Sequence, residues 1–251
     1  MHHPKIVWIT GASSGIGAAL ARVYLDRGAT VGVCGRNAEA LAALCAGNPR
    51  ARPYSFDILD AHAGDQAFAD FVSEVGVPDL AILNAGTHKP TPMKRFSRED
   101  AAFILGTNLQ GLFNTFEPVV ATMMAHKQGQ IAIVGSVAGY HGLPFAGVYS
   151  ATKAAVARFT ETAHMELKLY GIDVRLIAPG FVRTPLTDKN DFPMPFLMEA
   201  PAAAERIRKG LEGKGFEITF PKRLSWMLKL IAILPRWMSF GLMSGIIRKG
   251  S

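Results

Sequence analysis

Tyr149 and Lys153 lie four residues apart in this 251-residue chain, and Ser136 precedes the tyrosine by thirteen residues. If this segment is helical, the phenol and the ammonium share one face, with about 5–6 Å between their Cβ atoms. A positive charge there favours the phenolate and lowers a pKa that starts at about 10, which suits an acid–base pair. Ser136 would add a hydroxyl that holds a substrate oxygen. A tyrosine on a core helix with a solvated lysine nearby has the same spacing, so the chemistry depends on the rest of the chain.

A glycine-rich turn near the N-terminus supports the chemical interpretation. It follows the apolar run of residues 5–10 and precedes a helical pattern that ends at Gly28. Glycines there permit a tight turn and a close backbone approach, and the free N–H groups of the helix N-terminus bind a pyrophosphate. A simple tight turn would need neither three glycines nor two serines. The residues expected to contact a dinucleotide here are Thr10, Gly11, Ser13, Ser14, Gly15, Ile16 and Gly17.

Arg36 follows the second apolar run, where dinucleotide-binding folds usually distinguish between the two nicotinamide cofactors. An acidic residue would accept a hydrogen bond from the ribose 2′-hydroxyl. Gly35 and Arg36 instead offer space and positive charge to a 2′-phosphate. The sequence therefore favours NADP(H) over NAD(H), with a solvated loop charge as the alternative role of Arg36.

Short apolar runs alternate with helical patterns along most of the chain. We expect strands at 5–10, 30–34, 51–56, 80–83, 130–135, 172–178 and 216–220, and later helices at about 38–45, 61–75, 98–126 and 148–170. This order indicates an α/β fold: a single doubly wound (Rossmann) domain with a parallel sheet of about seven strands flanked by helices. Ligands bind at the carboxyl ends of such strands. The unusual residues Gly11, Arg36, Asp57, Asn84, Ser136 and Pro179 all fall at such ends.

Composition excludes several other classes of protein. Apolar residues make up 49% of the chain, and no low-complexity tract or repeat divides it, which indicates one domain. Cys34 and Cys45 have no CxxC or histidine partner pattern, so we expect neither a disulfide framework nor a metal site. Because no signal-peptide apolar region follows Met1, we expect a cytoplasmic protein.

The net charge of +7 comes from the end of the chain. Residues 201–251 hold 10 of the 27 Lys and Arg but only 3 of the 20 Asp and Glu. Residues 1–200 are therefore balanced, and they show no interleaving of basic and aromatic residues. We expect no nucleic-acid partner.

These motifs together resemble the short-chain dehydrogenase/reductase family, in its compact single-domain branch. The similarity covers residues 5–184 in the family's order, and no catalytic position departs from the pattern. Longer epimerase-type members share Tyr-x-x-x-Lys but use a different glycine spacing. The matching residues are Thr10-Gly11-x-x-x-Gly15-x-Gly17, Asp57, Asn84-Ala85-Gly86, Asn108, Ser136, Tyr149-x-x-x-Lys153 and Pro179-Gly180-x-x-x-Thr184.

The resemblance implies a catalytic group of Asn108, Ser136, Tyr149 and Lys153. Tyr149 would donate a proton to a carbonyl oxygen during reduction, or remove it from an alcohol during oxidation. Lys153 would lower the pKa of Tyr149 and bind the nicotinamide ribose. Ser136 would orient and polarise the carbonyl, and Asn108 would hold a water that links Lys153 to solvent.

The resemblance also implies further cofactor contacts and an assembly. Asp57 would contact the adenine, and members commonly form homodimers or homotetramers through the helices expected at about 98–126 and 148–170. The remaining residues expected at the cofactor are Ile58, Asn84, Ala85, Gly86, Tyr149, Lys153, Pro179, Gly180, Val182 and Thr184.

The end of the chain is less informative. We expect residues 1–221 to form the oxidoreductase domain, with a substrate-facing loop at about 181–215 whose strip 192–198 covers an apolar ligand or packs on the core. Residues 222–251 form an apolar and basic helical extension. Lys229, Pro235 and Arg236 interrupt it, so it contains no membrane-spanning run. Two short amphipathic helices there fit an interfacial membrane contact, a flap over the substrate pocket or a subunit interface.

The sequence thus predicts an NADP(H)-dependent oxidoreductase that interconverts a ketone or aldehyde with an alcohol, on an apolar or lipid-like substrate. The alternative is a cofactor-binding scaffold or membrane-associated regulator with incidental catalysis. The intact set of catalytic residues disfavours that alternative.

Overall fold

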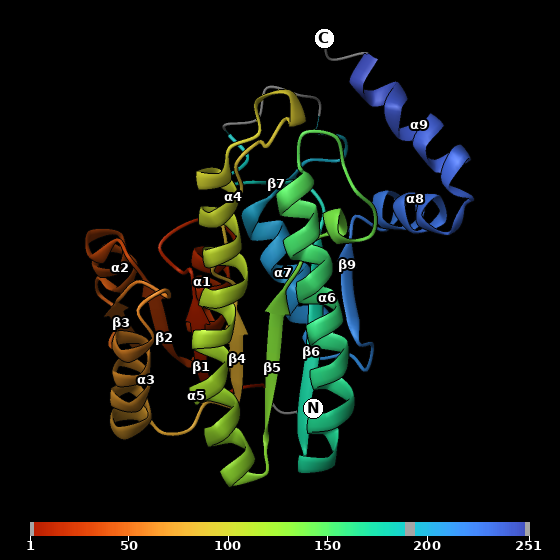
Figure 1. Cartoon of the computed structure of the whole chain (residues 1–251). Helices are drawn as coiled ribbons and strands as arrows, with labels where there is room; N and C mark the ends of the chain where they lie inside the picture. Colours follow the sequence, from red (N-terminus) through yellow and green to blue (C-terminus); the bar gives the residue numbers. More distant parts are fainter. Residues whose placement is uncertain (1–2, 189–193, 249–251) are drawn as a thin grey trace.

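A seven-stranded parallel sheet forms the centre of the protein (Figure 1). The computed structural model describes residues 3–188 and 194–248. The strand order is β3-β2-β1-β4-β5-β6-β9, and every pairing in this sheet is parallel. The strands are β1 (Ile6–Thr10), β2 (Thr30–Gly35), β3 (Ala51–Ser55), β4 (Leu80–Leu83), β5 (Gly129–Val134), β6 (Ile172–Pro179) and β9 (Glu217–Phe220). The central strands are buried on both faces, which explains their continuous apolar sequences.

Helices cover both faces of the sheet. On one face, α1 (Gly15–Asp26), α2 (Ala38–Cys45) and α7 (Ala200–Leu211) pack their apolar side chains against the strands. On the other face, α3 (Ala61–Val75), α5 (Gly111–His126) and α6 (Gly147–Leu167) do the same. This arrangement confirms the doubly wound α/β fold predicted from the sequence.

The strand order reverses between β1 and β4. From β1 the chain first builds outward to β2 and β3, and it then returns to place β4 on the other side of β1. The loops that follow β1 and β4 therefore diverge to opposite faces of the sheet and leave a crevice at the carboxyl ends. The glycine-rich turn and the Asn84-Ala85-Gly86 turn follow these two strands.

The single helix expected over about 98–126 is interrupted. α4 (Arg98–Leu105) is joined to α5 by a π-helical turn, Gly106–Gln110, which contains Asn108. A π turn inserts an extra residue into the helical register and commonly occurs at functional sites. Here it turns the Asn108 side chain into the protein, where this residue is almost completely buried.

The C-terminal extension consists of two helices, as the sequence predicted. α8 (Lys222–Ile233) and α9 (Arg236–Arg248) are separated at Leu234, whose extended backbone precedes Pro235. α8 lies beside β9, whereas α9 projects away from the sheet (Figure 1). None of the helices in the described residues is long and apolar enough to cross a membrane.

The segment expected to face the substrate contains both loop and helix. α7 packs in the core against α1, and β7 (Val182–Arg183) pairs in parallel with β8 (Met198–Glu199). Phe192 and Pro193 of the expected apolar strip lie outside the described residues.

Candidate active site

The glycine-rich turn adopts a conformation that side chains would prevent. Gly11 and Gly15 have φ values of +67° and +55°, in the left-handed region that favours glycine. A Cβ atom on Gly17 would lie 2.2 Å from the carbonyl oxygen of Gly11. Ser14 precedes α1 and makes no side-chain cap, so the first N–H groups of this helix remain available to an anion. The turn therefore fits a pyrophosphate group.

Asn84 holds the glycine-rich turn from the neighbouring strand. Its Nδ2 donates to the carbonyl oxygens of Thr10 and Gly11, both at 3.1 Å. The Thr10 hydroxyl in turn accepts from the N–H groups of Asn84 and Ala85, at 3.0 and 3.2 Å. These four hydrogen bonds tie the ends of β1 and β4 together across the crevice.

Arg36 and Asp57 lie at the carboxyl ends of β2 and β3. Arg36 Nη1 is 3.5 Å from Asp57 Oδ2, and both side chains are exposed. A Cβ atom on Gly35 would lie 3.2 Å from the Ser13 hydroxyl, so this edge borders the glycine-rich turn. Ile58 packs instead against Gly111 of α5. Arg36 thus forms an exposed ion pair at an edge that borders the glycine-rich turn.

Tyr149 and Lys153 both lie on α6, as their spacing predicted. Lys153 Nζ is 5.7 Å from the centroid of the Tyr149 ring, and it donates to the carbonyl oxygen of Val134 at 2.9 Å. Lys153 is almost completely buried, and this burial lowers the pKa of its ammonium to about 8. The lysine is therefore a cation of unusually low basicity next to the phenol.

Burial dominates the electrostatics of Tyr149. It raises the pKa of the phenol, and a hydrogen bond with Ser136 acts in the opposite direction. The sequence had led us to expect that Lys153 would lower this pKa. In this structure burial outweighs the Ser136 hydrogen bond, so the pKa of the phenol is raised and the phenol is protonated at neutral pH.

Asn108 holds the loop that follows β4. Its Oδ1 accepts from the Thr87 N–H at 2.7 Å, and its Nδ2 donates to the Thr87 carbonyl oxygen at 2.9 Å and to the Thr152 hydroxyl at 3.1 Å. Both N–H donors of the amide are thus committed to protein partners. A Cβ atom on Gly86 would lie 3.3 Å from Asn108 Oδ1 and 3.6 Å from Lys153 Nζ, so glycine leaves room between these two groups.

The loop after β6 closes on the same site. The Ser136 hydroxyl donates to the carbonyl oxygen of Pro179 at 3.4 Å. A Cβ atom on Gly15 would lie 2.9 Å from the Thr184 methyl group, so Thr184 lies directly over the glycine-rich turn. Gly180 abuts Leu224 of α8, and the Val182 side chain is buried in the core. The structure thus brings Gly15, from the first of the sequence motifs, next to Thr184, from the last.

His88 was not identified from the sequence. Its ring makes an edge contact with the Tyr149 ring at a centroid distance of 4.7 Å. Among the described residues its buried Nδ1 has no hydrogen-bond partner, and burial lowers the pKa of the imidazole. The only signal was its position two residues after Gly86, on the loop that leaves β4.

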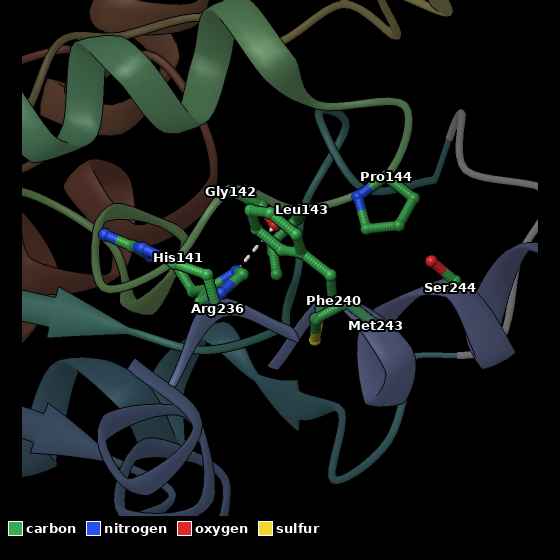
Figure 2. A pocket seen from close by; sticks show the side chains of 8 residues that line it. All are labelled: His141, Gly142, Leu143, Pro144, Arg236, Phe240, Met243 and Ser244. Atoms are coloured by element: carbon green, nitrogen blue, oxygen red, sulfur yellow. Dashed lines mark hydrogen bonds between the residues drawn. The ribbon is translucent and has the colours of Figure 1, made fainter. Parts of the chain in front are cut away.

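The C-terminal extension contacts the segment between Ser136 and Tyr149. Leu224 and Leu228 of α8 pack against Val137, and Glu217 of β9 accepts from both the Tyr140 hydroxyl and Lys229 Nζ. Farther along, a groove of about 270 Å³ separates α9 from residues 141–144 (Figure 2). Most of its walls are apolar, and the α9 side contributes Arg236, Phe240, Met243 and Ser244.

The fold and the site together define a class of protein. A glycine-rich turn that fits a pyrophosphate lies at the same edge of a parallel sheet as a buried lysine and a partly buried tyrosine and serine. These are the parts of a nicotinamide-dependent oxidoreductase built on a single Rossmann domain.

Comparisons with known proteins agree with this class. A sequence model described as short chain dehydrogenase matches residues 5–193. An uncharacterized oxidoreductase of Myxococcus xanthus is 36% identical over 231 residues, which cover 90% of this chain and 91% of the relative. A 3-oxoacyl-acyl-carrier-protein reductase of Thermotoga maritima is 34% identical over 74% of this chain and 77% of its own length. A sorbitol dehydrogenase of Cereibacter sphaeroides is 34% identical over 71% and 70%, respectively.

The fold has a close counterpart among solved structures. A short-chain dehydrogenase from Streptomyces avermitilis superimposes with a TM-score of 0.79 over 90% of each chain, at 24% identity. The chain belongs to the short-chain dehydrogenase family. It is an oxidoreductase that acts on CH–OH or carbonyl groups, in a family that uses NAD(P)(H).

Proposed function

We propose that this protein uses NADP(H) to interconvert a ketone or aldehyde with the corresponding alcohol, on an apolar substrate. The observation that carries the proposal is the grouping of Tyr149, Ser136 and Lys153 at the sheet edge that also holds the glycine-rich turn. An oxygen bound between the phenol and the serine hydroxyl would lie where a proton and a hydrogen bond are both available.

The nicotinamide, when bound, supplies or accepts the hydride. In reduction the Tyr149 hydroxyl gives its proton to the oxygen of the carbonyl group as negative charge develops there. The Ser136 hydroxyl donates a hydrogen bond to the same oxygen and orients it. The Lys153 ammonium stabilises the phenolate that remains. In the alcohol-to-carbonyl direction the same groups act in reverse, and Tyr149 must first be deprotonated.

The raised pKa of Tyr149 suits its role as a proton donor. A phenol that stays protonated at neutral pH is in the form that carbonyl reduction requires. Asn108 acts as a positioning residue, because its amide holds Thr87 of the loop after β4 and Thr152, the residue before Lys153. We assign to Lys153 the further roles of a contact to the nicotinamide ribose and of proton resupply through water.

The preference for NADP(H) rests on Arg36. Its guanidinium is exposed beside the glycine-rich turn, and no acidic residue stands directly after β2. Arg36 would bind the 2′-phosphate and Asp57 the adenine. The other residues assigned to the cofactor are Thr10, Gly11, Ser13, Ser14, Gly15, Ile16, Gly17, Ile58, Asn84, Ala85, Gly86, Pro179, Gly180, Val182 and Thr184.

An apolar substrate fits the walls of the groove between α9 and residues 141–144. Leu143, Pro144, Phe240 and Met243 are its apolar lining residues, and residues 141–144 belong to the segment that connects Ser136 to Tyr149. We further propose that residues 1–221 form the oxidoreductase domain, that the protein is cytoplasmic, and that it forms a homodimer or homotetramer. Exposed Phe103, Phe113 and Met165 on α4, α5 and α6 support assembly through these helices.

A turnover assay tests the proposal. Purified protein is mixed with NADPH or NADH and a panel of ketones and aldehydes of increasing chain length, and the reverse reaction is followed with the alcohols. We expect NADPH-dependent reduction that improves with chain length. Tight NADPH binding without turnover across both panels would favour the cofactor-binding scaffold instead.

A further inference from the structure

The two helices of the C-terminal extension point large apolar side chains into solvent. α8 packs Leu224 and Leu228 against the protein, while Trp226, Leu230 and Ile233 are 64%, 57% and 79% exposed. The exposed residues are spaced by four and three positions, so they form one stripe along the helix. An exposed apolar stripe of this kind marks an interaction site.

α9 continues the exposed apolar surface beyond Pro235. Trp237 is 76% exposed and Phe240 is 56% exposed, on a helix that projects away from the sheet (Figure 1). We call Trp226, Leu230, Ile233 and Trp237 the outer face; Phe240 also lines the groove against residues 141–144 and is not counted in it. The exposed stripe of α8 is not needed to hold this helix on the domain, because Leu224 and Leu228 do so from the opposite side of α8.

Positive charge flanks the outer face. Lys222 and Arg223 begin α8 and Arg236 begins α9, and all three are exposed. None of them has an ion-pair partner within the part of the chain that the structure describes. No Asp or Glu follows Glu217 in the sequence, so no negative charge offsets them locally. An apolar stripe with cations beside it and tryptophans on it is typical of a helix that lies in a lipid–water interface.

We propose that the outer face docks on an anionic lipid bilayer. The basic residues would meet the headgroups, and the tryptophans would enter the boundary between headgroups and acyl chains. Charge distinguishes this occupant from a second copy of the chain. In a symmetric dimer through this face, Lys222, Arg223 and Arg236 would approach the same cations of the partner, and like charges would oppose association. The contact is peripheral, since no described helix could span the bilayer.

Vesicle binding by the full-length protein tests this docking independently of any reaction. The vesicles contain phosphatidylcholine alone or phosphatidylcholine mixed with phosphatidylglycerol, at low and high ionic strength. We expect binding mainly to the anionic vesicles, and weaker binding at high salt because screening reduces the attraction. Lys222→Gln/Arg223→Gln/Arg236→Gln should weaken that binding on the order of 100-fold. Trp226→Ser/Trp237→Ser should weaken vesicle binding by a factor of the same order.

Two controls make the test specific. Leu169→Ser/Tyr170→Ser removes two exposed apolar side chains, 85% and 49% exposed, from another part of the surface and should bind as the wild type does. Lipids with brominated acyl chains should quench Trp226 and Trp237 but leave Trp8, which is 1% exposed.

The proposal would be overturned by three outcomes. The first is equal and negligible binding of the wild-type protein to both vesicle types. The second is unchanged vesicle binding by Trp226→Ser/Trp237→Ser. The third is quenching by brominated lipids that is as strong in this variant as in the wild type. A concentration-dependent dimer that Trp226→Ser/Trp237→Ser dissociates would assign the outer face to a second copy of the chain instead.

Discussion

Gly17→Ala should damage cofactor binding more than it damages the fold. The new Cβ atom would lie 2.2 Å from the Gly11 carbonyl oxygen and 2.7 Å from Asn84 Nδ2, whereas real Cβ atoms essentially never approach closer than 3.0 Å. The turn must therefore open by at least about 0.8 Å. This movement weakens the hydrogen bond from Asn84 to Gly11 and displaces the N–H groups that would face the pyrophosphate.

The size of the effect follows from opposing contributions. Overpacking costs about 1–3 kcal/mol, and loss of the hydrogen bond adds about 1 kcal/mol. Alanine is more favourable than glycine in a helix by about 1 kcal/mol, which offsets part of the loss. We expect a net destabilisation of about 1–3 kcal/mol. A misplacement of about 1 Å in a positioned site costs on the order of 100-fold, so NADPH affinity should fall by at least about tenfold.

Denaturant unfolding and fluorescence titration with NADPH measure the two effects separately. Gly241→Ala on α9 is the matched control, because no atom lies within 4 Å of its added Cβ. This control should bind NADPH normally and keep or slightly increase its stability. If Gly17→Ala bound NADPH with wild-type affinity, the assignment of this turn to the pyrophosphate would be wrong.

The remaining predictions concern the cofactor, pH and the extension. Arg36→Ser should weaken NADPH binding on the order of 10–100-fold and leave NADH binding unchanged; equal losses for both cofactors in the titration would contradict the role of Arg36. Because the pKa of His88 is lowered in the folded protein, the unfolded chain takes up this proton first, and stability falls as the pH drops below about 6.5. His88→Phe should reduce this acid sensitivity in thermal unfolding, and an unchanged pH profile would count against it. Glu217→Gln removes the ion pair with Lys229 and weakens the hydrogen bond from Tyr140. The local stability of α8 should therefore fall by about 1–3 kcal/mol, which is measured as faster hydrogen exchange of its backbone amides. Glu199→Gln, in an exposed ion pair with Arg183, is its control and should have no such effect.

The sheet was predictable because its strands are short apolar runs separated by helical patterns. Buried parallel strands must be apolar on both faces, so each one can be recognised from its own sequence without knowledge of its neighbours in the fold. Pro235 likewise predicted the break between α8 and α9, since a proline removes a backbone donor and restricts the residue before it.

The π turn at Gly106–Gln110 was not predictable from a local pattern. It is stabilised by hydrogen bonds between the Asn108 amide and both Thr87 and Thr152, which are distant in sequence. His88 was missed for the same reason, because its contact with Tyr149 exists only after β4 and α6 come together. The burial that raises the pKa of Tyr149 could not be inferred either, because a sequence reveals the neighbouring ammonium but not how deeply the phenol lies.

The most direct test of the proposed chemistry is Tyr149→Phe. This change removes the hydroxyl that donates the proton and keeps the ring that packs against His88. With a substrate found in the panel, kcat should fall by about 10²–10⁴-fold, which is the usual contribution of general acid catalysis. NADPH affinity and the unfolding transition should stay close to wild type. Wild-type turnover by purified Tyr149→Phe would contradict the assignment of this tyrosine as the proton donor.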